Sequence, residues 1–114
     1  MVKILRGNIS HKKVERFINE LEEFLEEHYE TSIKIYFSCR KANKEACNIL
    51  MDYLLDLKKD IVLIVSGNVN FYGLDVIQTL NKSHRVILLE GVRSIQQDRL
   101  LNEIDIIDLL NNSL

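Results

Sequence analysis

The stretch Ile61-Val62-Leu63-Ile64-Val65-Ser66-Gly67-Asn68-Val69-Asn70-Phe71-Tyr72-Gly73 decides the fold. Five apolar residues, mostly β-branched, are followed by a serine, a glycine and a short polar segment, and a helical pattern begins at about Leu74. A short, wholly apolar run is typical of a strand buried on both faces, as in the centre of a parallel sheet. Open α/β sheets bind their ligands at the carboxyl ends of such strands. We therefore expect the functional site at residues 67–73.

Strand-like patterns alternate with amphipathic helical patterns on either side of this stretch. Alternation of this kind, with loops of a few residues, predicts βαβ units and right-handed crossovers. The expected fold class is α/β, with a mostly parallel sheet, strand 61–65 at its centre and helices on both faces. Residues 1–114 are expected to form a single α/β domain. We expect strands at residues 2–5, 33–37, 61–65 and 85–89, and helices at 14–28, 46–57, 74–80 and over most of 94–114.

The composition excludes several classes of protein. The chain has 114 residues, of which 46% are hydrophobic and 28% charged, and its net charge is −2. The basic residues are scattered, so no nucleic-acid-binding surface is expected. No apolar run approaches the roughly 18 residues that a membrane span needs, and the apolar start at residues 1–6 is too short for a signal peptide. We expect a cytoplasmic protein without nucleic-acid or membrane partners.

Metal and cofactor motifs are missing from the sequence. Cys39 and Cys47 have neither metal-ligand spacing nor a C-x-x-C arrangement, which favours reduced thiols in a cytosolic protein. The three histidines are far apart in the sequence, and none has a cysteine or carboxylate partner at ligand spacing. Gly67 belongs to neither a Walker motif nor a G-x-G-x-x-G motif. We expect neither a metal nor a cofactor.

Polar and aromatic residues follow three of the expected strands. Because the carboxyl ends of parallel strands share one edge of a sheet, these residues are candidates for a common ligand-binding site. Some of these residues also have a purely structural interpretation. Gly67 would supply a tight turn, and one of Phe71 and Tyr72 would lie in the core. Cys39 beside Arg40 is either a thiol of lowered pKa or, as we favour, a small buried residue. The candidates are Ser38, Cys39, Arg40, Gly67, Asn68, Asn70, Phe71, Tyr72 and Glu90.

The order of these motifs resembles the proteolytic subunit of the Clp protease and the wider ClpP/crotonase superfamily. In that family one strand ends in a Ser-Pro-Gly-Gly type of turn, and the next ends in a Gly-x-x-x-Ser-x-Gly/Ala motif. Here Ser38 stands at the first turn, and the segment from Gly67 to Gly73 stands at the second. The family strand that leads to the catalytic histidine matches residues 85–90. The resemblance covers residues 2–91 and implies a ClpP-like α/β fold.

The departures from the family motifs concern the catalytic residues. Phe71 stands where the family has its nucleophilic serine, and Leu89 or Glu90 stands where it has its histidine. Arg40-Lys41 replaces the glycine pair whose N–H groups form the oxyanion hole. Acyl transfer needs a nucleophile, a base and oxyanion donors together. The resemblance therefore implies a non-catalytic module that acts by binding a protein or a ligand and by self-association.

A second resemblance competes with the first. Gly73-Leu74, after a strand and a polar loop, is similar to the Asp-x-Ser-x-Gly-Leu motif of STAS domains of the anti-sigma-factor antagonist type, although Phe71 or Tyr72 occupies the serine position. STAS domains open with a β-hairpin, whereas a long helical pattern separates the first two expected strands here. This difference favours the ClpP-like interpretation. A small thiol enzyme that uses Cys39 is the third and least favoured hypothesis.

The C-terminal segment carries more apolar residues than one helix face needs. A helix that is apolar around most of its circumference must be covered on more than one side. We therefore expect a homo-oligomer, a dimer or a trimer, to which this segment contributes. Its apolar residues are Leu100, Leu101, Ile104, Ile106, Ile107, Leu109, Leu110 and Leu114.

Overall fold

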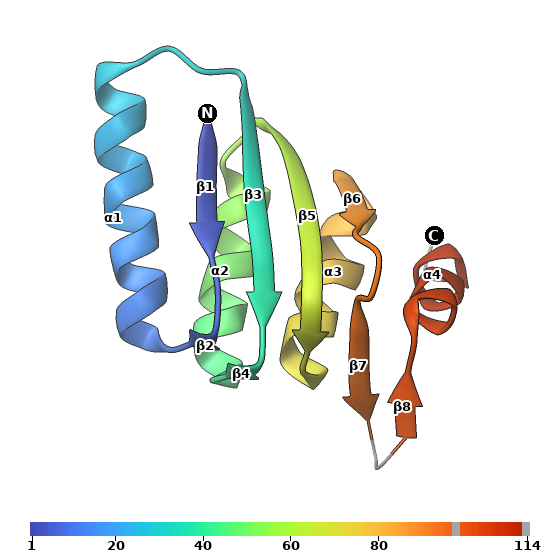
Figure 1. The fold of residues 1–114 in the computed structure, drawn as a ribbon. Coiled ribbons are helices and arrows are strands. Elements are labelled where there is room, and N and C mark those ends of the chain that lie inside the picture. The colour runs from blue at the N-terminus through green and yellow to red at the C-terminus, as the bar shows by residue number, and fades with distance from the viewer. Residues whose placement is uncertain (97–98, 113–114) are drawn as a thin grey trace.

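A mostly parallel β-sheet backed by a layer of helices forms the molecule (Figure 1). The structure is a computed structural model that describes residues 1–96 and 99–112. Its class is α/β, as the alternating sequence pattern predicts. The elements in chain order are β1 (Val2–Leu5), β2 (Asn8–Ile9), α1 (His11–Glu27), β3 (Ser32–Cys39), β4 (Lys41–Ala42), α2 (Lys44–Asp56), β5 (Asp60–Val69), α3 (Phe71–Asn81), β6 (Arg85–Leu88), β7 (Arg93–Gln96), β8 (Arg99–Leu101) and α4 (Glu103–Asn112).

Strand β5 is central in the sheet. The strand order is β1-β3-β5-β7-β8, and β6 pairs with β5 on the same side as β7. All of these pairs are parallel except the β7–β8 hairpin. The side chains of Ile61, Leu63 and Val65 are buried, which confirms the interpretation of this apolar run as a central strand. A separate two-residue parallel ladder joins β2 to β4.

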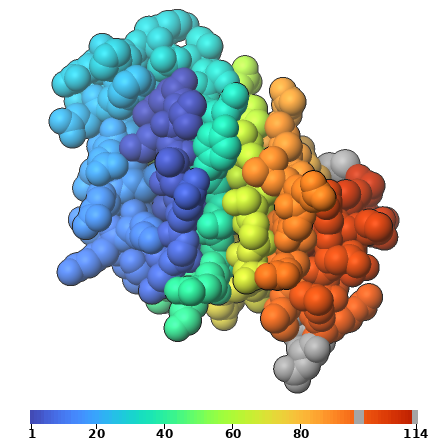
Figure 2. Space-filling model, viewed as in Figure 1, coloured from blue at the N-terminus to red at the C-terminus, as the bar shows by residue number. Residues whose placement is uncertain are grey.

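The helices lie on one face of the sheet, so the expectation of helices on both faces is wrong. Helices α1, α2, α3 and α4 pack side by side in that order. The other face of the strands is open to view in Figure 2. The reason is topological, because successive crossovers from β1 to β3, β5 and β6 all move in the same direction across the sheet. Right-handed crossovers that keep one direction place every helix on the same side.

Local sequence signals position the first three helices. Ser10 caps α1 by accepting a hydrogen bond from the Lys13 backbone N–H, at 3.2 Å. The apolar stripe of α1 is buried against the sheet, and its glutamates face solvent. Asn43 and Asn70 cap α2 and α3 in the same way. None of the helices in the described residues is both long and apolar enough to cross a membrane.

The segment after residue 93 differs from the helical pattern expected over most of 94–114. Residues 93–96 and 99–101 form the β7–β8 hairpin, and α4 begins only at Glu103. Asn102 and Asp105 form a capping box at the start of α4. Each side chain accepts a hydrogen bond from the other residue's backbone N–H. Ile106 and Leu110 of α4 are buried, whereas Ile104 and Ile107 are exposed. Leu114, the last apolar residue of this segment, lies outside the described residues.

Candidate ligand site at the carboxyl edge of the sheet

A bulge shapes the end of β5, where the sequence predicts a loop at residues 67–73. Strand β5 continues to Val69, and α3 begins only two residues later, at Phe71. Phe37 pairs with Val65 and Cys39 pairs with Val69, so four residues of β5 run beside two of β3. Gly67 accommodates the bulge with φ of 67°, in the left-handed region that favours glycine. The extra residues bend the strand and form one wall of the sheet edge.

Asn70 ties this edge together. Its backbone N–H donates to the Cys39 carbonyl at 2.7 Å, which joins the end of β5 to β3. Its side-chain Oδ1 accepts from the Gly73 N–H at 2.8 Å and from the Cys39 thiol at 3.4 Å. The acceptor oxygen of Asn70 is therefore occupied by protein groups, and its amide nitrogen carries the donors that are left for a ligand.

Two hollows lie side by side at this edge, and they share Arg40 and Asn68. The smaller has a volume of about 190 Å³ and lies between the ends of β3, β5 and β7. The larger has a volume of about 490 Å³ and lies beside the end of β1. The smaller is lined by Arg40, Asn68, Val69, Asn70, Ser94 and Ile95. The larger is lined by Arg6, Gly7, Ser38, Arg40, Ser66, Gly67 and Asn68.

The structure brings five of the nine candidate residues to these hollows: Ser38, Arg40, Gly67, Asn68 and Asn70. The other four line neither hollow. Cys39 is fully buried, and Glu90 lies in the exposed turn that follows β6. The rings of Phe71 and Tyr72 meet edge to face, with their centroids 5.6 Å apart. Tyr72 packs against the core and Phe71 is 52% exposed.

The edge is basic. Arg6 and Arg40 line the hollows, and Arg93 donates from Nε to the Asn68 side-chain oxygen. Within the described part of the chain, none of these three arginines forms an ion pair. Among residues 1–96 and 99–112, no carboxylate lines either hollow. An anion at this edge would therefore meet donors and positive charge.

The two cysteines form a buried pair behind the edge. Cys39 and Cys47 are both free thiols, and both are buried. A hydrogen bond with Cys47, followed in importance by burial, raises the pKa of the Cys39 thiol far above its ordinary value. A thiol held protonated in this way is a poor nucleophile. This environment is that of a small core residue, which is the interpretation that the sequence favours.

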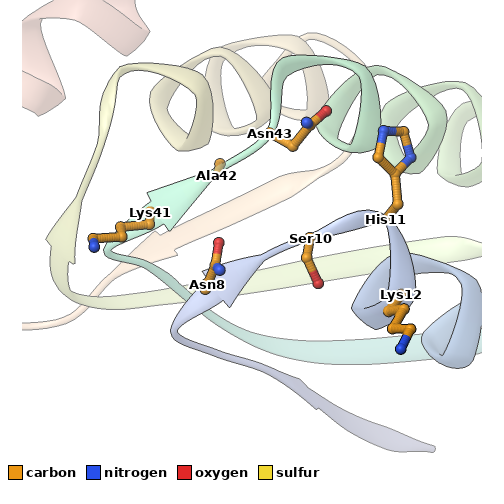
Figure 3. Close-up of a pocket in the computed structure, with 7 residues that line it drawn as sticks. All are labelled: Asn8, Ser10, His11, Lys12, Lys41, Ala42 and Asn43. Atoms are coloured by element: carbon orange, nitrogen blue, oxygen red, sulfur yellow. The ribbon is translucent and has the colours of Figure 1, made fainter.

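A further hollow of about 540 Å³ lies where the N-termini of α1 and α2 meet beside the β2–β4 ladder (Figure 3). Its lining includes the caps Ser10 and Asn43 and the basic residues His11, Lys12 and Lys41. The oxygens of both caps already accept backbone N–H groups, from Lys13 and Ala46. His11 faces Glu45, with 3.6 Å between Nε2 and the carboxylate. The two cap oxygens and the His11 ring are therefore already engaged by the protein itself.

Comparison with known proteins identifies the fold. No protein-family pattern matches the sequence, and no curated protein matches it. Among solved structures, the chain is similar to the crystal structure of the ClpP protease catalytic domain from Plasmodium falciparum, with a TM-score of 0.71 and 20% sequence identity. The fold is ClpP-like. The similarity covers 98% of this chain and 63% of the ClpP chain, and it confirms the ClpP-like fold that the motifs indicate.

Sequence reasoning missed Ser94, Ile95 and Arg6 at the ClpP-like sheet edge. Ser94 and Ile95 were assigned to a helix, so nothing placed them beside β5. Strand β7 pairs with β5 only through Asn68–Arg93 and Val69–Ser94. Two residue pairs are too few to produce a recognisable strand pattern in the sequence. Arg6 follows β1 directly, and the rule that ligands gather after parallel strands would have found it.

Proposed function

We propose that this chain is a ClpP-like module that acts by binding and has no serine-hydrolase turnover. The observation that carries the proposal is Phe71, the first residue of α3, at the position where the motif resemblance places the nucleophile. Its ring has neither a nucleophilic atom nor a proton to give. The resemblance places the histidine at Leu89 or Glu90. Leu89 donates its backbone N–H to the Val65 carbonyl, and Glu90 is exposed in the turn that follows β6. A base at Glu90 would have no nucleophile to activate, because the side chain of Phe71 is a hydrocarbon.

The remaining serines at the edge lack a histidine. Ser38 and Ser66 line the larger hollow, but none of the three histidines, all within the described residues, lines it with them. His11 lies beside Glu45, and His28 stacks on Phe24 at the end of α1. His84 lies at the opposite, amino end of the strands, beside Ser32 and Asp60. Losing the nucleophile and its base removes most of the rate of a serine hydrolase.

A fluorophosphonate probe and unstructured peptide substrates test this proposal. We expect no stoichiometric labelling and no cleavage by the full chain. The variants Ser38→Ala and Ser66→Ala are the matched controls, because each removes one hydroxyl from the larger hollow. Labelling or cleavage that disappears in either variant would show that the module is an enzyme.

The other two hypotheses receive less support. In a STAS domain the first two strands form a hairpin, whereas here β1 and β3 are parallel and α1 lies between them. A thiol enzyme needs an accessible thiolate, and Cys39 is buried with a raised pKa. Thiol labelling at neutral pH tests the thiol hypothesis, and we expect both cysteines to react only after unfolding. Labelling of Cys39 in the folded protein would favour the enzyme.

The proposal also includes self-association as a dimer or trimer and a cytoplasmic location. Exposed apolar side chains on β7, β8 and α4 support self-association. Two free, buried thiols are typical of a reducing compartment.

A further inference from the structure

Ser94 carries a buried hydroxyl with no protein partner. Its exposure is 1%, and its Oγ makes no hydrogen bond to any other described residue. Leaving a buried donor unpaired costs about 1–3 kcal/mol, so unpaired hydroxyls inside proteins are rare. The backbone of Ser94 is fixed by its pairing with Val69 of β5 and Leu101 of β8. An unpaired group on such a constrained strand points to a partner from outside the chain.

Ser94 is one of the residues that line the smaller hollow of the carboxyl edge. That hollow also contains Arg40 and the side-chain amides of Asn68 and Asn70. The Asn68 oxygen already accepts from Arg93, and the Asn70 oxygen already accepts from Gly73, so both amides offer N–H donors. The hollow also lies at the N-cap of α3, where the helix dipole favours negative charge. Every polar group around it is therefore suited to an acceptor.

Size and charge restrict the ligand further. Among the residues that the structure describes, no carboxylate lines the hollow, and Arg40 is exposed and forms no ion pair with any of them. Its volume of about 190 Å³ equals about six water molecules at roughly 30 Å³ each. This is room for one small oxyanion and a few attached atoms, and the side chains of Val69 and Ile95 supply an apolar wall beside it.

We propose that this hollow binds the oxyanion group, a carboxylate or a phosphate, of a small ligand. The Ser94 hydroxyl and the Arg40 guanidinium donate to the oxyanion, and the amides of Asn68 and Asn70 complete its shell. The inference deepens the proposed function, because it gives the binding edge a ligand chemistry. Charged hydrogen bonds from Arg40 supply most of the affinity, and Ser94 supplies the buried contact that selects a ligand able to enter.

An amide-resolved NMR titration of the full chain tests the inference. Sodium acetate and inorganic phosphate are the two probes, and sodium chloride holds the ionic strength constant. We expect saturable shifts of the Ser94 and Asn70 amide signals, and the tighter probe identifies whether the natural group is a carboxylate or a phosphate. Shifts that rise linearly with either salt, or that spread evenly over the surface, would overturn the site.

Three variants assign the contacts. Arg40→Gln and Ser94→Ala should each weaken the better probe by about tenfold or more, the usual effect of losing a hydrogen bond to a charged group. Arg85→Gln is the matched control, since Arg85 is an exposed arginine at the amino end of β6. Ser94→Ala should keep or raise its melting temperature, because it removes a buried unpaired hydroxyl and no protein hydrogen bond. Equal affinities in all three variants would refute the assignment.

The two proposals fail separately. Absent anion binding refutes this inference and leaves the lack of hydrolase activity untouched. Fluorophosphonate labelling of Ser38 or Ser66 refutes the proposed function whatever the titration gives.

Discussion

The buried thiol pair gives the chain a specific response to alkaline pH. Hydrogen bonding to Cys47 and burial raise the pKa of Cys39 above its ordinary value of 9.0, so the folded pair keeps a proton that the unfolded chain releases. A raised folded pKa means that its stabilisation is complete below pH 9.0 and declines above it. We expect the free energy of unfolding in urea to fall from about pH 9 upward, by at most about 1.4 kcal/mol per pH unit for one proton.

The variant Cys39→Ala separates this effect from general alkaline denaturation. Removing the thiol should flatten the decline between pH 9 and pH 10, even though the variant begins from a lower stability. The phenol of Tyr53 adds a similar decline at higher pH, because burial and its hydrogen bond to Glu22 also raise its pKa. A slope between pH 9 and pH 10 that is identical in the two proteins would contradict the role of Cys39.

Gly73 is the closest packing point between α3 and the sheet. A Cβ at this position would lie 2.8 Å from the Cβ of Cys39 and 2.8 Å from Cγ1 of Val69. Both neighbours are buried on strands that cannot move far, so Gly73→Ala should cost about 1–3 kcal/mol, as overpacking does. Urea unfolding measures the loss. Gly67→Asn is the control, since nothing lies within 4 Å of that Cβ and asparagine tolerates a positive φ. Equal losses in both variants would argue against close packing.

At the scale of elements, the fold depends most on β5, which pairs with β3, β6 and β7. Leu63 is fully buried between β3 and β6 beneath the helices, and an unpaired carboxylate there would cost several kcal/mol. We expect Leu63→Asp to abolish the cooperative unfolding transition seen by circular dichroism. Lys34→Asp is the control, because Lys34 is exposed on the open face of the neighbouring strand. A folded Leu63→Asp protein would show that β5 is not central in solution.

The sequence predicts α1 from an apolar stripe on one side and β5 from an unbroken apolar run, because both elements supply the core. The β7–β8 hairpin differs from the predicted helix because its pattern is inverted. The exposed pair Ile95 and Leu100 is apolar, whereas the buried side carries the polar Ser94 opposite Leu101. A polar residue on the buried side hides the alternation that would identify a strand. The placement of helices on one face depends on the direction of the crossovers, which no local pattern records.

The same reasoning explains which site residues could be predicted. Ser38, Arg40, Asn68 and Asn70 come after parallel strands, and the rule that ligands gather there found them. Ser94 could not be found, because its importance lies in a missing hydrogen bond that only the three-dimensional structure reveals. Cys39 is the converse case. Its position at the end of an expected strand suggests a site residue, but its side chain is buried in the core.

At the scale of the whole molecule, the uncovered sheet face is apolar in its middle. Ile4, Tyr36, Ile64 and Ile87 are register neighbours and form one continuous row across β1, β3, β5 and β6. Ile4 is 59% exposed, and Ile87 is exposed too. The next row along the strands consists of Val2, Lys34, Val62 and Arg85, so basic side chains flank the apolar row. Ile95, Leu100, Ile104 and Ile107, on β7, β8 and α4, are further exposed apolar side chains.

This surface is the basis for the predicted self-association. Two such faces packed sheet to sheet would bury their apolar rows in a layer about 10 Å thick. The flanking Lys34 and Arg85 repel their counterparts in a symmetric pair, so added salt should strengthen the association by screening them. A stable interface needs about 800 Å² from each partner, more than the β7–β8 hairpin alone provides. We therefore expect the open face and the C-terminal segment to contribute together.

Light scattering at micromolar concentrations, at low and at high salt, tests the association. The full chain should form a dimer or trimer whose fraction rises with sodium chloride. Ile95→Asp and Ile104→Asp should shift it to monomer without unfolding, since these side chains are 67% and 68% exposed. Ile49→Asp is the matched control, because Ile49 is an exposed isoleucine on α2, which belongs neither to the open sheet face nor to the C-terminal segment. A monomer at every salt concentration, or equal dissociation by all three variants, would rule out this surface as the interface.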